Sequence, residues 1–86
     1  MSKQFTYTIT DPVGIHARPA GQLVKLTQQY DSDVTLDLSG KTADAKHILA
    51  VMSLGVGKED ELTVTIAGND EDEAARQIES FFRDNL

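Results

Sequence analysis

Three stretches of the chain, residues 5–9, 34–38 and 62–66, alternate apolar and polar side chains. A period of two places every apolar side chain on one face of an extended strand, so each stretch is predicted to be a strand buried on one side. The second stretch is followed by Ser39-Gly40, which favours a tight turn into a further short strand ending near Lys46. Four strands are therefore expected, each with one face in water.

Helical spacing of apolar residues predicts three helices between and after these strands. Residues 17–29, approximately, are predicted to form an amphipathic helix. Residues 47–53 are long enough for two helical turns, and Gly55 is expected to end this second helix. Residues 70–73 are all acidic and complement the positive end of a last helix that ends near Leu86.

The predicted order is βαββαβα in a single domain of residues 1–86. A sheet with one wet face is antiparallel, and its helices gather on the other face. The fold class is therefore α+β: an open-faced β-sandwich, with a four-stranded antiparallel sheet and three helices on one face.

Charge and composition exclude several classes of protein. The chain has 86 residues, no cysteine and a net charge of −6. Its acidity disfavours binding to nucleic acid and to anionic membranes, and the absence of cysteine excludes disulfides and thiolate metal sites. The first residues lack the apolar core of a signal peptide, and no apolar run is long enough to cross a bilayer. We expect a cytoplasmic protein, without membrane insertion.

The start of the first helix carries the candidate chemistry. Pro19 is tolerated only in the first turn of a helix, which places His16 at about the N-cap. Histidine is a poor cap, so its presence there indicates another use. The unpaired amides of Ala17 and Arg18 would favour an anion, to which the Arg18 guanidinium adds a fork of donors. The positive helix end disfavours imidazolium, so we expect a neutral, nucleophilic ring that could carry a phosphoryl group.

Two plainer interpretations of these residues remain open. His16 could be a partly buried turn residue, with Arg18 an ordinary surface charge. His16 and His47 could instead form a metal pair, but no third ligand is evident, so we expect no metal and no cofactor.

The whole chain resembles the HPr family, the histidine-containing phosphocarriers of the phosphoenolpyruvate:sugar phosphotransferase system. The resemblance rests first on Gly14-Ile15-His16-Ala17-Arg18-Pro19-Ala20, which is similar to the active-site signature of that family. It continues through residues 30–34, Gly40-Lys41, Ala45-Lys46, residues 51–55 and residues 68–70.

The resemblance implies a stoichiometric phosphocarrier rather than an enzyme. His16 would accept a phosphoryl group on Nδ1 (the pros nitrogen) from enzyme I, with phosphoenolpyruvate as the ultimate donor. It would then pass the group to sugar-specific enzyme IIA domains, and Arg18 would contact the phosphoryl group. The family fold is the one that the pattern predicts, and we expect a monomer.

The resemblance also implies a docking patch where the first two helices meet. Its apolar members suit a surface that fits several partners in turn, although some of Ile48, Leu49 and Met52 must also serve the core. The expected docking residues are Ala17, Ala20, Lys25, Lys46, His47, Ile48, Leu49 and Met52.

Two residues depart from the family pattern. Val13 stands where the family usually has a short polar residue, so a hydrogen bond near the active loop would be missing. His47 stands where Gram-positive members have a serine that a dedicated kinase phosphorylates, so that regulatory role is not expected here.

Two other functions compete with the sugar phosphocarrier. The first keeps the chemistry but serves a regulatory phosphorelay as an HPr paralogue. The second is a non-phosphorylated binding module of the same fold, in which Arg18 and the helix end hold an anion or a protein.

Overall fold

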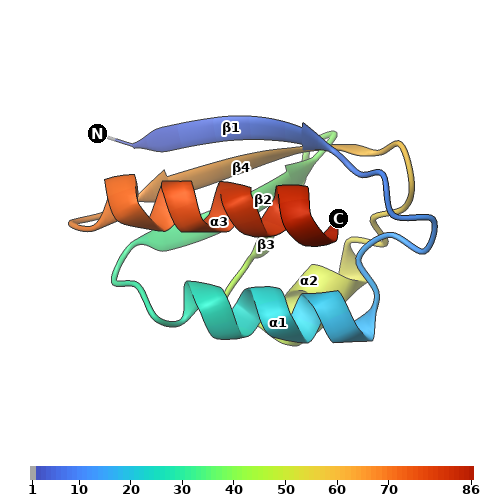
Figure 1. The fold of residues 1–86 in the computed structure, drawn as a ribbon, viewed down its shortest axis with the longest axis horizontal. Coiled ribbons are helices and arrows are strands. Elements are labelled where there is room, and N and C mark those ends of the chain that lie inside the picture. Colours follow the sequence, from blue (N-terminus) through green and yellow to red (C-terminus); the bar gives the residue numbers. More distant parts are fainter. Residues whose placement is uncertain (1) are drawn as a thin grey trace.

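The computed structural model describes residues 2–86, and its elements follow the predicted order. They are β1 (Lys3–Thr8), α1 (Ala17–Thr27), β2 (Asp33–Leu38), β3 (Lys41–Asp44), α2 (Ile48–Ser53), β4 (Glu61–Ala67) and α3 (Glu71–Asn85). The α+β prediction is confirmed: the three helices lie on one face of an open sheet (Figure 1).

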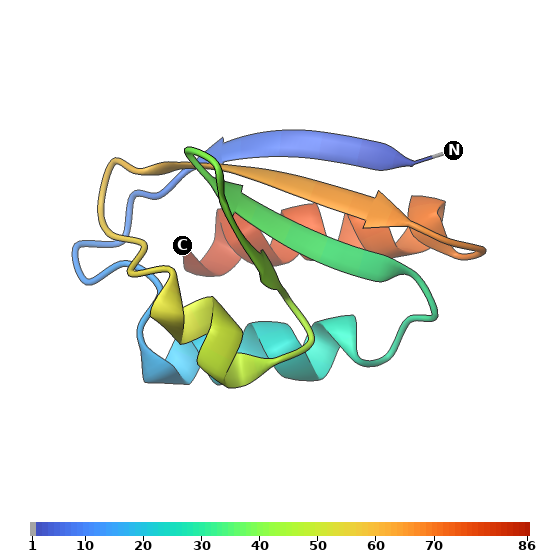
Figure 2. The ribbon, with the colours of Figure 1, turned by 180° about the vertical axis from the view of Figure 1, so that it is seen from behind.

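The four strands form one antiparallel sheet in the order β1-β4-β2-β3 (Figure 2). The register sets Phe5 opposite Val64, and Val64 opposite Leu36. These three side chains therefore share the helix-covered face, while the alternating threonines lie on the other face. The predicted division of each strand into an apolar and a polar face is thus observed.

The core lies between the sheet and the helices and is centred on Phe82 of α3. Phe82 is fully buried, and its ring makes edge-on contacts with Phe5 (5.8 Å between centroids) and Tyr7 (5.6 Å) of β1. Edge-on aromatic pairs are favoured electrostatically beyond the area they bury. These contacts hold the long helix α3 along β1 and β4.

Two elements end earlier than the sequence predicts. α1 ends at Thr27 rather than near residue 29, and β3 ends at Asp44 rather than near Lys46. The Thr27 hydroxyl donates to the Ala45 carbonyl at 2.7 Å, and the Asp44 carboxylate accepts from the Lys46 amide at 2.9 Å. The Thr27 bond ties the end of α1 to the turn that enters α2, and the Asp44 bond lies within that turn.

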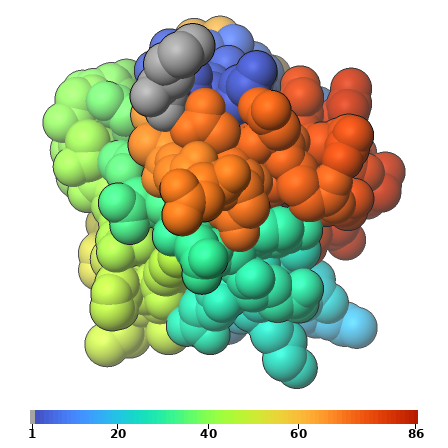
Figure 3. Space-filling model, turned by 90° about the vertical axis from the view of Figure 1, so that its left-hand side faces the viewer, coloured from blue at the N-terminus to red at the C-terminus, as the bar shows by residue number. Residues whose placement is uncertain are grey.

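A second side-chain tie closes the end of the molecule where α3 begins. The Asp70 carboxylate accepts hydrogen bonds from the Ser32 hydroxyl and from the amides of Asp31 and Ser32. The segment around residue 70 (orange) lies directly against the segment around residue 32 (teal) in Figure 3. The Ser32 hydroxyl, and then the Asp31 amide, lower the pKa of the Asp70 carboxyl below its ordinary value of 3.8.

No helix within residues 2–86 is both long and apolar enough to cross a membrane.

Candidate functional site

The loop between β1 and α1 is anchored to two distant parts of the chain. The Ile9 amide donates to the Asp60 carbonyl at 2.9 Å, and the Glu59 amide donates to the Ile9 carbonyl at 2.7 Å. The amides of Thr10 and Asp11 both donate to the Leu86 carbonyl oxygen, at 2.6 and 2.9 Å. The loop that leads to His16 is therefore held by the β4 entry and by the end of α3, as Figures 1 and 2 show.

Gly14 allows this loop to pass close to the segment after α2. Its φ is +78°, and a β-carbon built there would lie 2.2 Å from the Val56 carbonyl oxygen. The next residue, Ile15, donates its amide to the same oxygen at 3.1 Å. Only glycine combines the left-handed backbone with so close an approach.

The start of α1 is arranged as the sequence predicts. His16 is the N-cap in an extended conformation, and its carbonyl accepts the first helical hydrogen bond, from Ala20, at 2.9 Å. Within the described residues, the His16 side chain makes no capping hydrogen bond, and the amides of Ala17 and Arg18 have no acceptor. Pro19 has no amide hydrogen. The helix end therefore presents two unpaired donors beside the imidazole.

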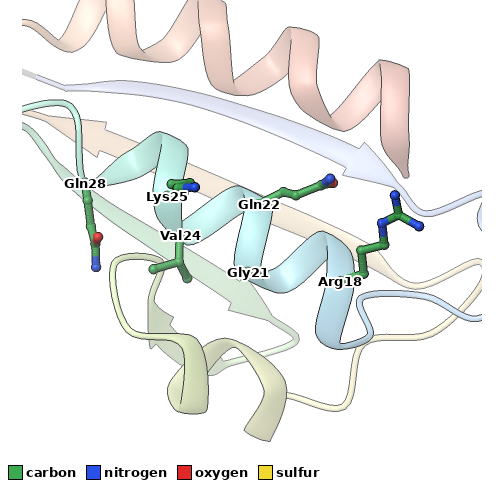
Figure 4. Close-up of a pocket in the computed structure, with 6 residues that line it drawn as sticks. All are labelled: Arg18, Gly21, Gln22, Val24, Lys25 and Gln28. Carbon is green, nitrogen blue, oxygen red and sulfur yellow. The ribbon is translucent and has the colours of Figure 1, made fainter.

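The His16 side chain borders a polar pocket of about 230 Å³. Its lining includes residues with a guanidinium, an imidazole, a carboxylate and two side-chain amides, and the guanidinium and the amides can donate hydrogen bonds to an anion. Figure 4 shows Arg18 reaching from α1 toward the end of α3, with the Gln22 side chain beside it. The lining residues are Asp11, His16, Arg18, Pro19, Gln22 and Asn85.

An exposed apolar patch lies on α2, which packs against α1. Leu49 is 77% exposed, Met52 41% and Ile48 40%, whereas Val51 is fully buried and belongs to the core. The expectation that some of Ile48, Leu49 and Met52 serve the core was therefore wrong, because all three are exposed. Large exposed side chains gathered on one short helix are typical of an interaction surface.

Not all expected docking residues are available at the surface. Ala20 has no exposed surface, so its inclusion in the docking patch was wrong: it packs inside the core. Ala17 and Lys25 are exposed. The Lys46 ammonium donates to the Tyr30 carbonyl at 2.8 Å, which holds its charge at the C-terminal end of α1.

His47 lies at the N-cap of α2, beside the exposed patch. Its side chain is largely exposed, and Nε2 lies 3.6 Å from a carboxylate oxygen of Asp44. His16 and His47 start different helices, α1 and α2.

Three pocket residues, Asp11, Gln22 and Asn85, were not predicted from the sequence. Gln22 lies one helical turn after Arg18 on α1, and this spacing is a signal that could have identified it. Asn85 comes from the opposite end of the chain, and only the folded structure brings it to His16.

The sequence profile described as the PTS HPr component phosphorylation site matches residues 3–84. The chain belongs to the HPr family. HPr proteins are phosphocarriers of the phosphotransferase system rather than catalysts, so the coarse prediction of function is confirmed.

Solved HPr structures share the fold along nearly the whole chain. The histidine-containing phosphocarrier protein of Mycoplasma is 35% identical, with a TM-score of 0.92, over 95% of this chain and 93% of its own. HPr-C-His of Thermoanaerobacter tengcongensis is 34% identical, with a TM-score of 0.84, over 98% and 99%. Crh, a catabolite repression protein of Bacillus subtilis, is 32% identical, with a TM-score of 0.78, over 93% and 92%. The Crh structure is a domain-swapped dimer, and a monomeric state for this chain stays a prediction.

Proposed function

We propose that this protein accepts a phosphoryl group from enzyme I on His16 and passes it to enzyme IIA domains of sugar permeases. One observation carries the proposal: the imidazole of His16 stands at a helix start where two amides are unpaired and a guanidinium borders the same pocket. Together with membership of the HPr family, this arrangement supports a carrier of phosphate on nitrogen.

The chemistry follows from the groups in the pocket. A ring nitrogen of His16, Nδ1 by the family resemblance, attacks phosphorus. An N–P bond forms as the bond from phosphorus to the donor breaks, and the donor keeps that electron pair. The phosphoryl oxygens then accept hydrogen bonds from the amides of Ala17 and Arg18 and from the Arg18 guanidinium. Transfer to the acceptor reverses the same steps.

The apolar patch on α2 supplies a docking surface next to this chemistry. Ile48, Leu49 and Met52 are adaptable aliphatic side chains, and methionine in particular accommodates different partners. Arg18 and Lys25 add positive charge on α1, so an acidic partner surface with apolar side chains fits the two helices. A carrier in this exchange works in the cytoplasm with its donor.

Incubation with phosphoenolpyruvate and enzyme I tests the proposal, followed by mass spectrometry for one added, acid-labile phosphoryl group. Wild type should gain the group, and His16→Ala should gain none. Arg18→Ala should still be phosphorylated, but roughly 10- to 100-fold more slowly, because one charge-assisted contact is lost while the helix amides remain. A wild type that gains no mass would favour the non-phosphorylated binding module.

A regulatory relay is the second candidate, because Crh, a catabolite repression protein, is 32% identical to this chain. Onward transfer separates the two functions. A sugar phosphocarrier should pass its phosphoryl group to an enzyme IIA domain, whereas a regulatory paralogue should become phosphorylated and fail in that step.

A further inference from the structure

Asp11 makes hydrogen bonds through its amide, its carbonyl and its carboxylate in the loop before His16. Its amide donates to the Leu86 carbonyl oxygen at 2.9 Å, and its own carbonyl accepts from the Gly14 amide at 3.0 Å. Its carboxylate oxygen Oδ1 accepts from the Val13 amide at 2.8 Å. Asp11 also lines the pocket that His16 borders. One residue therefore connects the end of α3, the loop and the pocket.

The turn closed by Asp11 leads directly to His16. The Gly14 carbonyl accepts from the His16 amide at 3.1 Å, and the neighbouring Ile15 amide is held by the Val56 carbonyl oxygen. Gly14 packs closely against the same segment, because a β-carbon built there would lie 2.2 Å from the Val56 carbonyl oxygen. The orientation of the 11–14 turn thus sets where the N-cap backbone, and with it the imidazole, can lie.

The Val13 side chain cannot order this turn itself. It is apolar and largely exposed, so it neither donates nor accepts a hydrogen bond, and its amide depends on a neighbour. A side chain that accepts a bond from the amide two residues later fixes a turn locally. The Asp11 carboxylate supplies that bond.

We infer that Asp11 is a positioning residue for phosphoryl transfer: its carboxylate holds the Val13 amide inside the turn that the Asp11 carbonyl closes at Gly14, and thereby orients the loop that leads to His16 at the start of α1. The inference rests on the proposed function for its effect on rate. Because it acts through an accepted hydrogen bond, an asparagine with the same side-chain oxygen should replace it, whereas an alanine should not.

Phosphorylation kinetics of wild type, Asp11→Ala and Asp11→Asn test this inference. With enzyme I, Asp11→Ala should lower kcat about 10-fold, because a misplaced nucleophile loses rate steeply. KM should stay unchanged, since the apolar patch on α2 is intact. The small donor phosphoramidate should show the same loss, which excludes an effect on docking. Asp11→Asn should restore both rates.

Asp37→Ala is the matched control. The Asp37 carboxylate accepts from the Gly40 amide at 2.8 Å in the β2–β3 hairpin, so the variant loses a similar bond outside the pocket. It should keep the wild-type rates. Unchanged rates in Asp11→Ala, or equal losses in Asp11→Ala and Asp11→Asn, would overturn the positioning role.

Amide hydrogen exchange keeps this test independent of the proposed function. The Val13 amide should exchange faster in Asp11→Ala than in wild type or Asp11→Asn, and the His16 ring resonances should shift only in Asp11→Ala. If wild type accepts no phosphoryl group from either donor, the proposed function fails. The exchange result still shows whether the Asp11 carboxylate orders the turn before His16. Unchanged Val13 exchange in Asp11→Ala would overturn the positioning role.

Discussion

At the residue scale, the N-cap position of α1 is occupied by His16, whose imidazole is a potential nucleophile but a poor helix cap. His16 makes no capping hydrogen bond with any residue from 2 to 86, whereas serine or aspartate at an N-cap usually does. Removing this histidine should therefore cost the fold about 1 kcal/mol or less. The amides left unpaired are the same ones that the proposed phosphoryl group would use.

Asp70 gives the fold a dependence on acid. Because its folded pKa lies below its ordinary value of 3.8, its ionised form stabilises the native state above that pH. This stabilisation is lost as the pH falls through the folded pKa. Asp70→Asn should be less stable than wild type at pH 7 in urea unfolding, and the difference should shrink below pH 3.8.

Ser32→Ala provides the second arm of this test, because the Ser32 hydroxyl donates to the Asp70 carboxylate. In a Ser32→Ala background the Asp70→Asn change should destabilise less than in wild type. Additive effects at pH 7 would contradict the account of the acid dependence.

We predict that His47 removes this protein from regulation by a serine kinase. It occupies the N-cap of α2, where a phosphoserine of about −2 charge would lie next to the exposed patch. Histidine has no hydroxyl to phosphorylate. A kinase of the Gram-positive type with ATP should leave the wild type unmodified and label His47→Ser, as peptide mass mapping would show. Labelling of the wild type on any serine would refute this.

At the element scale, the connection from α2 to β4 contains a strained residue. Glu59 has a φ of +73°, a left-handed conformation that costs a side chain roughly 1 kcal/mol. The Glu59 amide donates a hydrogen bond to the Ile9 carbonyl oxygen. Because this bond anchors the loop before His16, the connection has to keep the left-handed conformation at Glu59. Glu59→Gly should raise the free energy of unfolding by about 0.5 to 1 kcal/mol in urea titrations. Glu61→Gly, in β4, should lower it instead, since glycine weakens a strand.

Most of the fold was predictable, because each strand and helix has a local periodicity. The alternation at residues 62–66 reflects the burial of one face of β4, and no distant contact is needed to recognise it. Element ends were less predictable, since α1 and β3 end where Thr27 and Asp44 make side-chain hydrogen bonds. Asp70 was placed in the first turn of the last helix, yet its carboxylate bonds Ser32 and Asp31 instead.

The candidate site was predictable as far as it lies within one stretch of chain. His16, Arg18 and Pro19 are neighbours in sequence, and the helix start arranges them by local geometry. Asn85 and the Leu86 carbonyl oxygen reach the site only through the packing of α3. No local pattern encodes such a contact. Ala20 shows the opposite error, because a helical position next to the site faces the core.

At the scale of the whole molecule, different residues make the exposed patch on α2 and the His16 pocket. The Asp70–Ser32 hydrogen bond lies where α3 begins, and the His16 pocket is lined by residues from the start of α1 and from the end of α3. The two ends of α3 lie far apart along the molecule in Figure 1. Among the described residues, none from α2 lines that pocket. The patch can therefore be changed without touching the core or the pocket. Variants on it should alter partner binding and leave the fold intact.

Leu49→Asp tests the docking surface. Leu49 is 77% exposed, so the variant should unfold within about 0.5 kcal/mol of wild type. It should raise KM for enzyme I at least 10-fold, because an apolar contact becomes a charge facing an acidic partner. Phosphorylation by phosphoramidate should be unchanged. Thr6→Asp, with the same added charge on the open face of the sheet, should keep the wild-type KM, and an equal KM increase there would count against the patch.

The most direct test of the central claim is the position of the phosphoryl group. After reaction with phosphoenolpyruvate and enzyme I, the protein should be digested at neutral or alkaline pH and its peptides mapped by mass. The account predicts one acid-labile phosphoryl group, on the peptide that contains His16, and none on the peptide that contains His47. A phosphoryl group found on any other residue, with His16 unmodified, would contradict it.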